Sequence, residues 1–194
     1  MSASRTKPER TAVELELTVQ KAVNSPGLPT DTELRRWLAA ALGRSAAITV
    51  RFVGAAEGRR LNREYRDKDY ATNVLSFGYS SNGRGQALAG DLVLCAPVVR
   101  REARAQGKTL AAHIAHLTVH GALHLQGHDH QSLSAAARME ALEKRILAQL
   151  GYPDPYAGDA GRRAGDGRIM SPCPSAPART ASPTRHRHGR RKGA

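Results

Sequence analysis

The segment 110–125 constrains the fold more than any other part of the chain, because it is largely apolar. A helix that is hydrophobic around most of its circumference is stable only when other elements surround it. The sequence therefore predicts a central, buried helix at 110–125. His120 and His124 lie at its C-terminal end and His130 follows shortly after. We expect these histidines in a cleft rather than on an outer surface.

The three histidines have the spacing H-x3-H-x5-H, with Gly127 between the second and the third. Residues four apart share a helix face, so His120 and His124 present their imidazoles side by side. Gly127 tolerates positive φ, which lets the chain leave the helix and bring His130 to the same point. Three neutral imidazoles suit one Zn²⁺ ion and leave a coordination position open, as in catalytic zinc sites. The alternative is three ordinary histidines at an exposed helix end.

The same spacing matches the metzincin protease pattern H-E-x-x-H-x-x-G-x-x-H, except at one position. Gly121 stands where the protease has the glutamate that takes a proton from the attacking water. We find no obvious acidic substitute near the motif in the sequence. A metal-dependent peptidase is therefore an alternative function, and the missing glutamate weakens it.

The composition points to a polyanionic partner. The formal net charge is +13 and the pI is near 10.7, and clustered Lys and Arg side chains displace counterions from phosphates. RNA or the ribosome is the simplest such partner. With one Trp, five Tyr and two Phe, there is little material for base stacking, so we expect weak sequence preference.

Cysteine usage and hydropathy indicate a cytoplasmic protein. Cys95 and Cys173 are the only cysteines, so neither a disulfide framework nor a thiolate zinc site is available. No apolar run approaches the roughly 18 residues of a membrane span, and residues 1–10 are polar without an apolar signal core. We therefore expect neither secretion nor a membrane partner.

Hydrophobic periodicity and capping residues predict the element order β-α-β-α-β-β-α-α-α, an α+β fold. Strands are expected at 12–19, 48–53, 74–77 and 91–95, and helices at 31–42, 55–65, 97–106, 110–125 and 133–150. The last two strands form a pair linked by a glycine-rich loop, and Ser132 or Ser134 caps the last helix.

The chain divides into three parts by composition. Residues 1–10 are expected to be flexible, residues 11–151 to form one metal-dependent domain, and residues 152–194 to be a disordered basic tail rich in Pro, Gly and Arg. This tail is either a solvated extension or an arm that tethers RNA without sequence specificity.

Two further segments identify a family. They are LNREYRDKD at 61–69 with TNVLSF at 72–77, and GDL at 90–92. Together with the histidine motif, they closely resemble the YbeY family of single-strand-specific endoribonucleases that mature rRNA. The likeness spans residues 13–150, and the combination is far more specific than any one motif. Two positions depart from the family pattern: Gly78 replaces the usual proline and His128 the usual tyrosine.

The resemblance implies a mixed sheet of four strands packed with about five helices, in which a central helix carries the metal site. It implies one zinc ion bound by His120, His124 and His130, and action at the 3′ end of small-subunit rRNA and in ribosome quality control. The expected partners are rRNA and the small ribosomal subunit, with ribosomal proteins or GTPases as further candidates and no DNA. A non-catalytic ribosome assembly factor remains an alternative.

The expected catalytic residues are the three histidines and Arg66, which matches the functional arginine of the family. A guanidinium can hold two oxygens of the scissile phosphate and offset the charge that develops there. The alternative for Arg66 is a surface ion pair with Asp67 or Asp69.

Several other polar residues have alternative interpretations. His116, one turn before His120, supports the metal site, shuttles protons, or is a packed or solvated histidine without a role in the site. His113 and His128 are expected to be ordinary histidines. Asp129 either orients a ligand or caps the turn. Asn73 and Ser76 either line the cleft or serve the strand ends.

Overall fold

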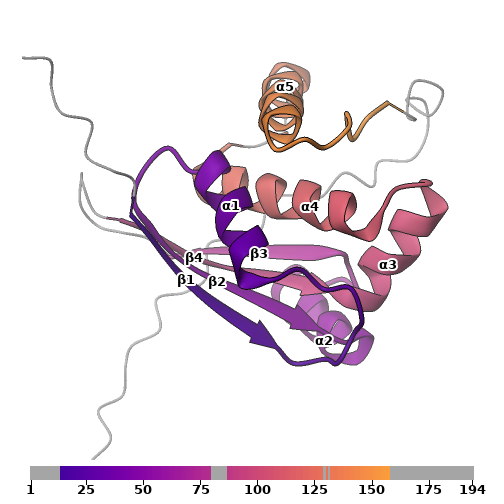
Figure 1. The fold of residues 1–194 in the computed structure, drawn as a ribbon. Helices are drawn as coiled ribbons and strands as arrows, with labels where there is room; N and C mark the ends of the chain where they lie inside the picture. The colour runs from indigo at the N-terminus through magenta and orange to yellow at the C-terminus, as the bar shows by residue number, and fades with distance from the viewer. Residues whose placement is uncertain (1–13, 80–86, 129, 131, 158–194) are drawn as a thin grey trace, which may run out of the picture.

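The computed structural model describes residues 14–79, 87–128, 130 and 132–157. Its elements are β1 (Leu15–Lys21), α1 (Asp31–Ala41), β2 (Ala46–Val53), α2 (Ala55–Arg66), β3 (Val74–Tyr79), β4 (Leu88–Cys95), α3 (Ala96–Ala105), α4 (Leu110–Leu125) and α5 (Leu133–Gln149) (Figure 1). The predicted element order and the α+β class are confirmed. The residues expected to form a flexible N-terminus, 1–10, lie outside the described residues.

The four strands form one mixed sheet in the order β1-β2-β4-β3. β1 and β4 both pair with β2 in parallel, whereas β3 pairs with β4 antiparallel. The expected strand pair is therefore β3 and β4. The first strand lies further along the chain than predicted, because its pairing with β2 runs from Leu15 to Lys21. Gln20 and Lys21, at the end of the strand, are both polar, so the alternation of apolar and polar residues stops before them.

Helices cover both faces of the sheet (Figure 1). Leu92 and Leu94 of β4 join the core beneath α1, α4 and α5, whereas Val93 and Cys95 join the smaller core beneath α2. α4 lies between the sheet and α5, and the predicted central helix is thus found. Among the described residues, no helix combines the length and hydropathy needed to cross a bilayer.

Side-chain hydrogen bonds fix the ends of the two helices that carry the site. The Thr109 hydroxyl accepts from the backbone N–H of Ala112 at the start of α4, and Ser132, rather than Ser134, accepts from Ala135 at the start of α5. At the end of α4, the Gln126 amide donates to the carbonyl of Ala41 and accepts from the N–H of Gly43. This side chain ties the end of α4 to the end of α1.

The described domain continues beyond residue 151, where the composition placed its end. The ring of Tyr152 packs edge-on against Trp37 with centroids 5.9 Å apart, and Tyr156 donates a hydrogen bond to Glu143 of α5. The average composition of residues 152–194 predicts a disordered tail, but these two tyrosines supply apolar surface that packs on the domain. The part of the expected disordered tail from 158 to 194 lies outside the described residues.

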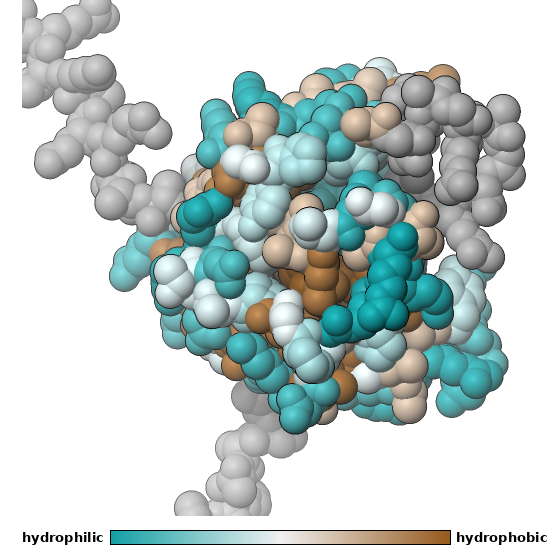
Figure 2. Space-filling model, turned by 45° about the vertical axis from the view of Figure 1, so that its right-hand side comes forward, coloured by the Kyte–Doolittle hydropathy of each residue, from teal (hydrophilic) through white to brown (hydrophobic). Residues whose placement is uncertain are grey.

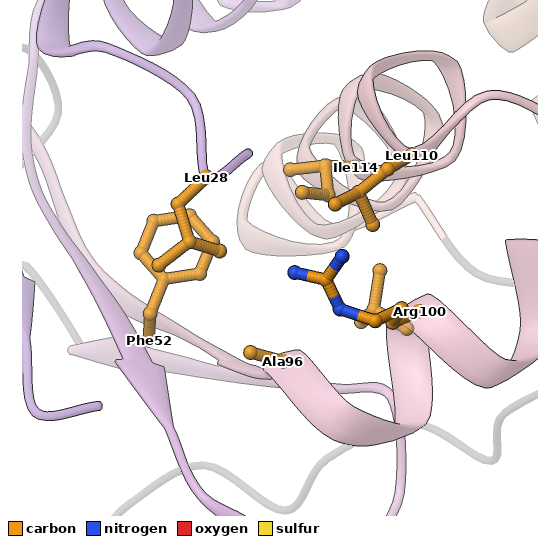
Figure 3. A pocket seen from close by; sticks show the side chains of 7 residues that line it. Leu28, Phe52, Ala96, Arg100, Leu110 and Ile114 are labelled. Carbon is orange, nitrogen blue, oxygen red and sulfur yellow. The ribbon is translucent and has the colours of Figure 1, made fainter. Parts of the chain in front are cut away.

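One pocket opens between the loop that follows β1, the end of β2, α3 and α4. Figure 3 shows its lining: Leu28, Phe52, Ala96, Val99, Arg100, Leu110 and Ile114. The Arg100 guanidinium donates to the Ser25 hydroxyl and to the Pro26 carbonyl, so its charge is engaged at the rim. In Figure 2, hydrophilic side chains surround a small hydrophobic area on the face that comes forward. None of the histidines lines the pocket of Figure 3.

Candidate metal centre

The structure brings His120, His124 and His130 together at the end of α4. One ring nitrogen from each lies within 4.8 Å of the others. The Nε2 atoms of His120 and His124 are 3.0 Å apart, and the ring centroid of His130 is 5.0 Å from that of His124. The spacing of the sequence motif thus becomes a convergent set of imidazoles.

The turn after α4 accounts for the position of His130. Gly127 has φ +88°, in the left-handed region that favours glycine. Its N–H donates to the carbonyl of His124, and the N–H of His128 donates to the carbonyl of Leu123. This pair of hydrogen bonds is a Schellman motif, which ends the helix and reverses the chain. Gly127 therefore has the role that the sequence predicted.

The residues present fit a zinc ion. Tetrahedral zinc with Zn–N distances of about 2.0–2.1 Å places its ligand nitrogens about 3.4 Å apart, close to the separation between His120 and His124. Burial above all, together with the neighbouring His120 and His130, lowers the pKa of His124 to about 4. His124 is therefore neutral near neutral pH, which is the protonation state that binds a metal.

A glutamate on α5 completes the cluster, and the sequence reasoning missed it. Glu143 is fully buried, and the Nδ1–H of His120 donates to its Oε1 over 2.7 Å. Burial acts to raise the pKa of Glu143, but hydrogen bonds from His116 and His120 prevail and lower it, so the carboxylate is ionised. One signal was available: Glu143 lies on the same helix stripe as buried Met139 and Leu147.

The second oxygen of Glu143 has two donors of its own. The Nε2–H of His116 donates to Oε2 over 3.1 Å, and the Tyr156 hydroxyl also donates to this atom. Burial lowers the pKa of His116, so its ring is neutral. Burial and the charge of Glu143 raise the pKa of Tyr156, so the hydroxyl keeps its proton. Among the interpretations of His116, its hydrogen bond to Glu143 favours support of the metal centre.

Asn73 and His113 belong to a different cluster, centred on Glu102 of α3. His113 Nε2 lies 3.1 Å from Glu102 Oε2, and the Asn73 amide donates to the same oxygen over 2.9 Å. Asn73 also accepts from the N–H of Val74, where β3 begins. The structure therefore supports the strand-end reading of Asn73. Asp129 lies outside the described residues.

Gly121 is the point where α4 comes closest to the sheet. A Cβ atom there would lie 2.7 Å from Leu92 Cδ2 and 3.0 Å from Ser76 Oγ. The position of the protease glutamate thus has no room for a side chain. Glu143 contacts the Nδ1 of His120, whereas the Nε2 of that ring faces His124 and the expected metal position. Neither position 121 nor Glu143 therefore supplies the glutamate base of a metzincin protease, which weighs against the peptidase alternative.

Arg66 lies in another layer of the molecule. Arg66 is in the last turn of α2. The residue before it, Tyr65, packs edge-on against Phe77 on the sheet face opposite α4. Asp67 and Asp69 are the partners expected if Arg66 forms a surface ion pair. Asp69 accepts two hydrogen bonds from Arg59, and Asp67 is the C-cap residue of α2, with φ 54°. The structure brings the three histidines together on the α4 side of the sheet, whereas Arg66 belongs to the helix that covers the opposite face.

Comparison with known proteins identifies a family. The family model described as "Endoribonuclease YbeY" matches residues 18–151 of the chain. This span covers the whole sheet except the first residues of β1, and all five helices.

Curated relatives of this chain have the same name. An Endoribonuclease YbeY from Aromatoleum aromaticum is 60% identical over 152 residues, which cover 77% of this chain and 97% of that protein. Proteins of that name from Methylibium petroleiphilum and Thiobacillus denitrificans are 53% and 54% identical, over 78% and 75% of this chain and 99% and 98% of their own lengths.

Proposed function

The chain belongs to the YbeY family, and from this membership we propose that it is a zinc-dependent endoribonuclease that cuts single-stranded RNA. Its proposed role is maturation of the 3′ end of small-subunit rRNA and ribosome quality control, in the cytoplasm. The convergence of His120, His124 and His130, with Glu143 in hydrogen-bonding contact with His120, is the observation that carries the proposal. The name shared by the relatives supports the choice of RNA as substrate.

Each residue of the centre has a distinct task in this proposal. His120, His124 and His130 would hold the ion through neutral ring nitrogens. A bound zinc ion supplies Lewis acidity and lowers the pKa of a coordinated water toward neutrality. Arg66 would bind the scissile phosphate through its guanidinium fork and offset developing charge. Arg66 is supplied by the last turn of α2, not by the helix that carries His120 and His124.

The charge of the protein supports a nucleic-acid substrate. A net charge of +13 attracts phosphates over a long range and at many points of the surface. The proposed partners are therefore rRNA and the small ribosomal subunit, with ribosomal proteins or GTPases as further candidates.

Metal removal and two variants test the proposal. Metal-free and zinc-loaded protein are mixed with single-stranded rRNA fragments and, separately, with casein. We expect RNA cleavage only with zinc, none from His124→Ala, and about 10²–10³-fold slower cleavage from Arg66→Ala, as for loss of one charge-stabilising donor. His128→Ala is the matched control, since His128 is exposed and follows the same turn.

Three outcomes would overturn parts of the proposal. RNA cleavage that survives both zinc removal and His124→Ala eliminates the catalytic metal. Zinc-dependent cleavage of casein identifies a peptidase. Tight RNA binding without cleavage, in fully zinc-loaded protein, identifies a non-catalytic assembly factor.

A further inference from the structure

We propose that Glu143, held by His116 and Tyr156, is a positioning residue that sets the tautomer and ring orientation of His120 for metal binding. This inference rests on the proposed metal site and assigns a task to residues that contact no substrate. Its basis is a carboxylate whose two oxygens have different partners: Oε1 contacts His120, and Oε2 contacts His116, also on α4, and Tyr156, from the segment after α5.

The contact with His120 determines where the ring carries its proton. Nδ1 of His120 lies 2.7 Å from Oε1 of Glu143, and a metal-ligating histidine donates its other ring N–H to such a carboxylate; this geometry assigns the proton to Nδ1. A neutral imidazole has one N–H, and its other nitrogen then carries a lone pair. That nitrogen is Nε2, which lies 3.0 Å from the Nε2 of His124. Glu143 thus turns the metal-binding atom of His120 toward the other ligands.

Glu143 can act this way because it is itself immobilised. Its side chain is fully buried, and Oε2 is held from two further directions. His116 reaches it from one turn earlier on α4, and Tyr156 from the segment that follows α5. A buried carboxylate is costly unless charged or polar partners satisfy it. An apolar side chain would suit the stripe of Met139 and Leu147 better, so stability alone does not account for a glutamate there.

The protein contains its own comparison. Glu102 and His113 form another histidine–carboxylate pair between α4 and a neighbouring helix, and its 3.1 Å distance equals that between His116 and Glu143. Among the described residues, two groups could hold an ion: one is His120, His124 and His130, and the other is His116, His120 and Glu143. His113 belongs to neither group. The positioning role therefore predicts that disrupting Glu143, and not Glu102, changes metal binding.

The experiment measures the zinc dissociation constant of the full-length, metal-free protein by competition with a colorimetric chelator. Glu143→Gln replaces an acceptor oxygen by an NH₂ group, so three donors must share one oxygen. We expect it to raise the dissociation constant about 10–100-fold, the usual cost of losing such a partner. Tyr156→Phe removes one of the two hydrogen bonds to Oε2, and we expect a rise on the order of threefold. Glu102→Gln and Tyr152→Phe are the matched controls and should leave it unchanged.

A second readout does not depend on folding of the variants. Long-range ¹H–¹⁵N spectra of the metal-free wild-type protein report which nitrogen of His120 carries the proton, and we expect Nδ1. A proton on Nε2, zinc affinity of a folded Glu143→Gln equal to that of the controls, or two ions bound per chain with Glu143 as a ligand would each overturn the inference.

The results also separate this inference from the proposed function. If Glu143→Gln weakens zinc binding but the loaded wild-type protein cuts no RNA, the proposed function fails and the positioning role stands. If RNA cleavage requires zinc but the Glu143→Gln and Glu102→Gln affinities are equal, the positioning role fails and the proposed function stands.

Discussion

Charge at the metal centre is divided sharply between neighbouring residues. Hydrogen bonds from two imidazoles keep Glu143 ionised although it is fully buried. His124, less deeply buried and beside two other rings, is kept neutral by burial and by those rings. A metal ion bound there would meet the neutral ring of His124, while the negative charge of Glu143 lies one ring further away, on the far side of His120. This separation leaves the full charge of an ion available to polarise a substrate.

The low pKa of His124 predicts how the stability of the metal-free protein depends on pH. Its folded-state pKa is about 4, below the ordinary value of 6.5. Between these values the unfolded chain binds more protons than the folded one, so the free energy of unfolding rises with pH across this window. The contribution is complete above 6.5 and is lost as the pH falls through about 4. Burial lowers the pKa of His116 as well and acts in the same direction.

Urea unfolding of metal-free protein at closely spaced pH values across that window measures the slope. We expect His124→Gln to flatten it, whereas His128→Gln, which alters an exposed ring, should retain the wild-type slope. Equal slopes for wild type and His124→Gln would show that His124 is not held neutral by its surroundings.

Among the elements, α4 and the turn after it determine the site most directly. The helix presents two ligands, and the Schellman motif at Gly127 returns the third. α5 ends in the same way: Gly151 has φ +84°, and the N–H of Tyr152 donates to the carbonyl of Leu147. The chain thus uses one turn geometry twice, once before a metal ligand and once before the tyrosines of the C-terminal segment.

These two glycines allow the effect of the turn on metal binding to be separated from its effect on stability. A Cβ atom at either position meets nothing within 4 Å, so alanine introduces backbone strain without a clash. We expect Gly127→Ala and Gly151→Ala each to lower the free energy of unfolding by about 1–2 kcal/mol, the cost of a left-handed non-glycine residue. Only Gly127→Ala should also weaken zinc binding, because His130 follows that turn. Chelator competition and urea unfolding measure the two effects, and equal zinc affinities would contradict the role of the turn.

The sequence was sufficient for the parts of the site that depend on local geometry. The four-residue spacing of His120 and His124 and the glycine after them are properties of one helix and its end, so they could be predicted without tertiary information. Glu143 could not be predicted in this way. Its side chain is in contact with His120 only because α5 packs on α4, and helix periodicity does not show which buried polar residue finds a partner on another helix. Tyr156 was missed because it lies beyond Gly151, in a segment whose average composition predicts disorder.

Considered as a whole, the molecule assembles the centre from segments on several layers. The sheet supports α4 from below through the close approach at Gly121, and α5 covers it from above and contributes Glu143. The segment after α5 then returns to place Tyr156 on the same carboxylate. Arg66 is in the last turn of α2, and α2 packs on the other face of the sheet.

The distribution of charge gives a test of RNA binding at this scale. Residues 158–194 carry nine of the 30 Lys and Arg residues and two of the 17 acidic ones, so residues 1–157 retain 21 basic and 15 acidic residues. Each phosphate neutralised on a single strand adds about 0.7 to the magnitude of the slope of log affinity against log salt. We expect the full chain to lose affinity for single-stranded RNA steeply with salt. A chain that ends at residue 157 should still bind, with a shallower slope, because its own charge is positive.

Filter binding over a range of salt concentrations measures both slopes. Affinity that is indifferent to salt in the full chain would exclude phosphate contacts as the basis of binding, and loss of all binding on truncation would assign the RNA contacts to residues 158–194 rather than to the domain.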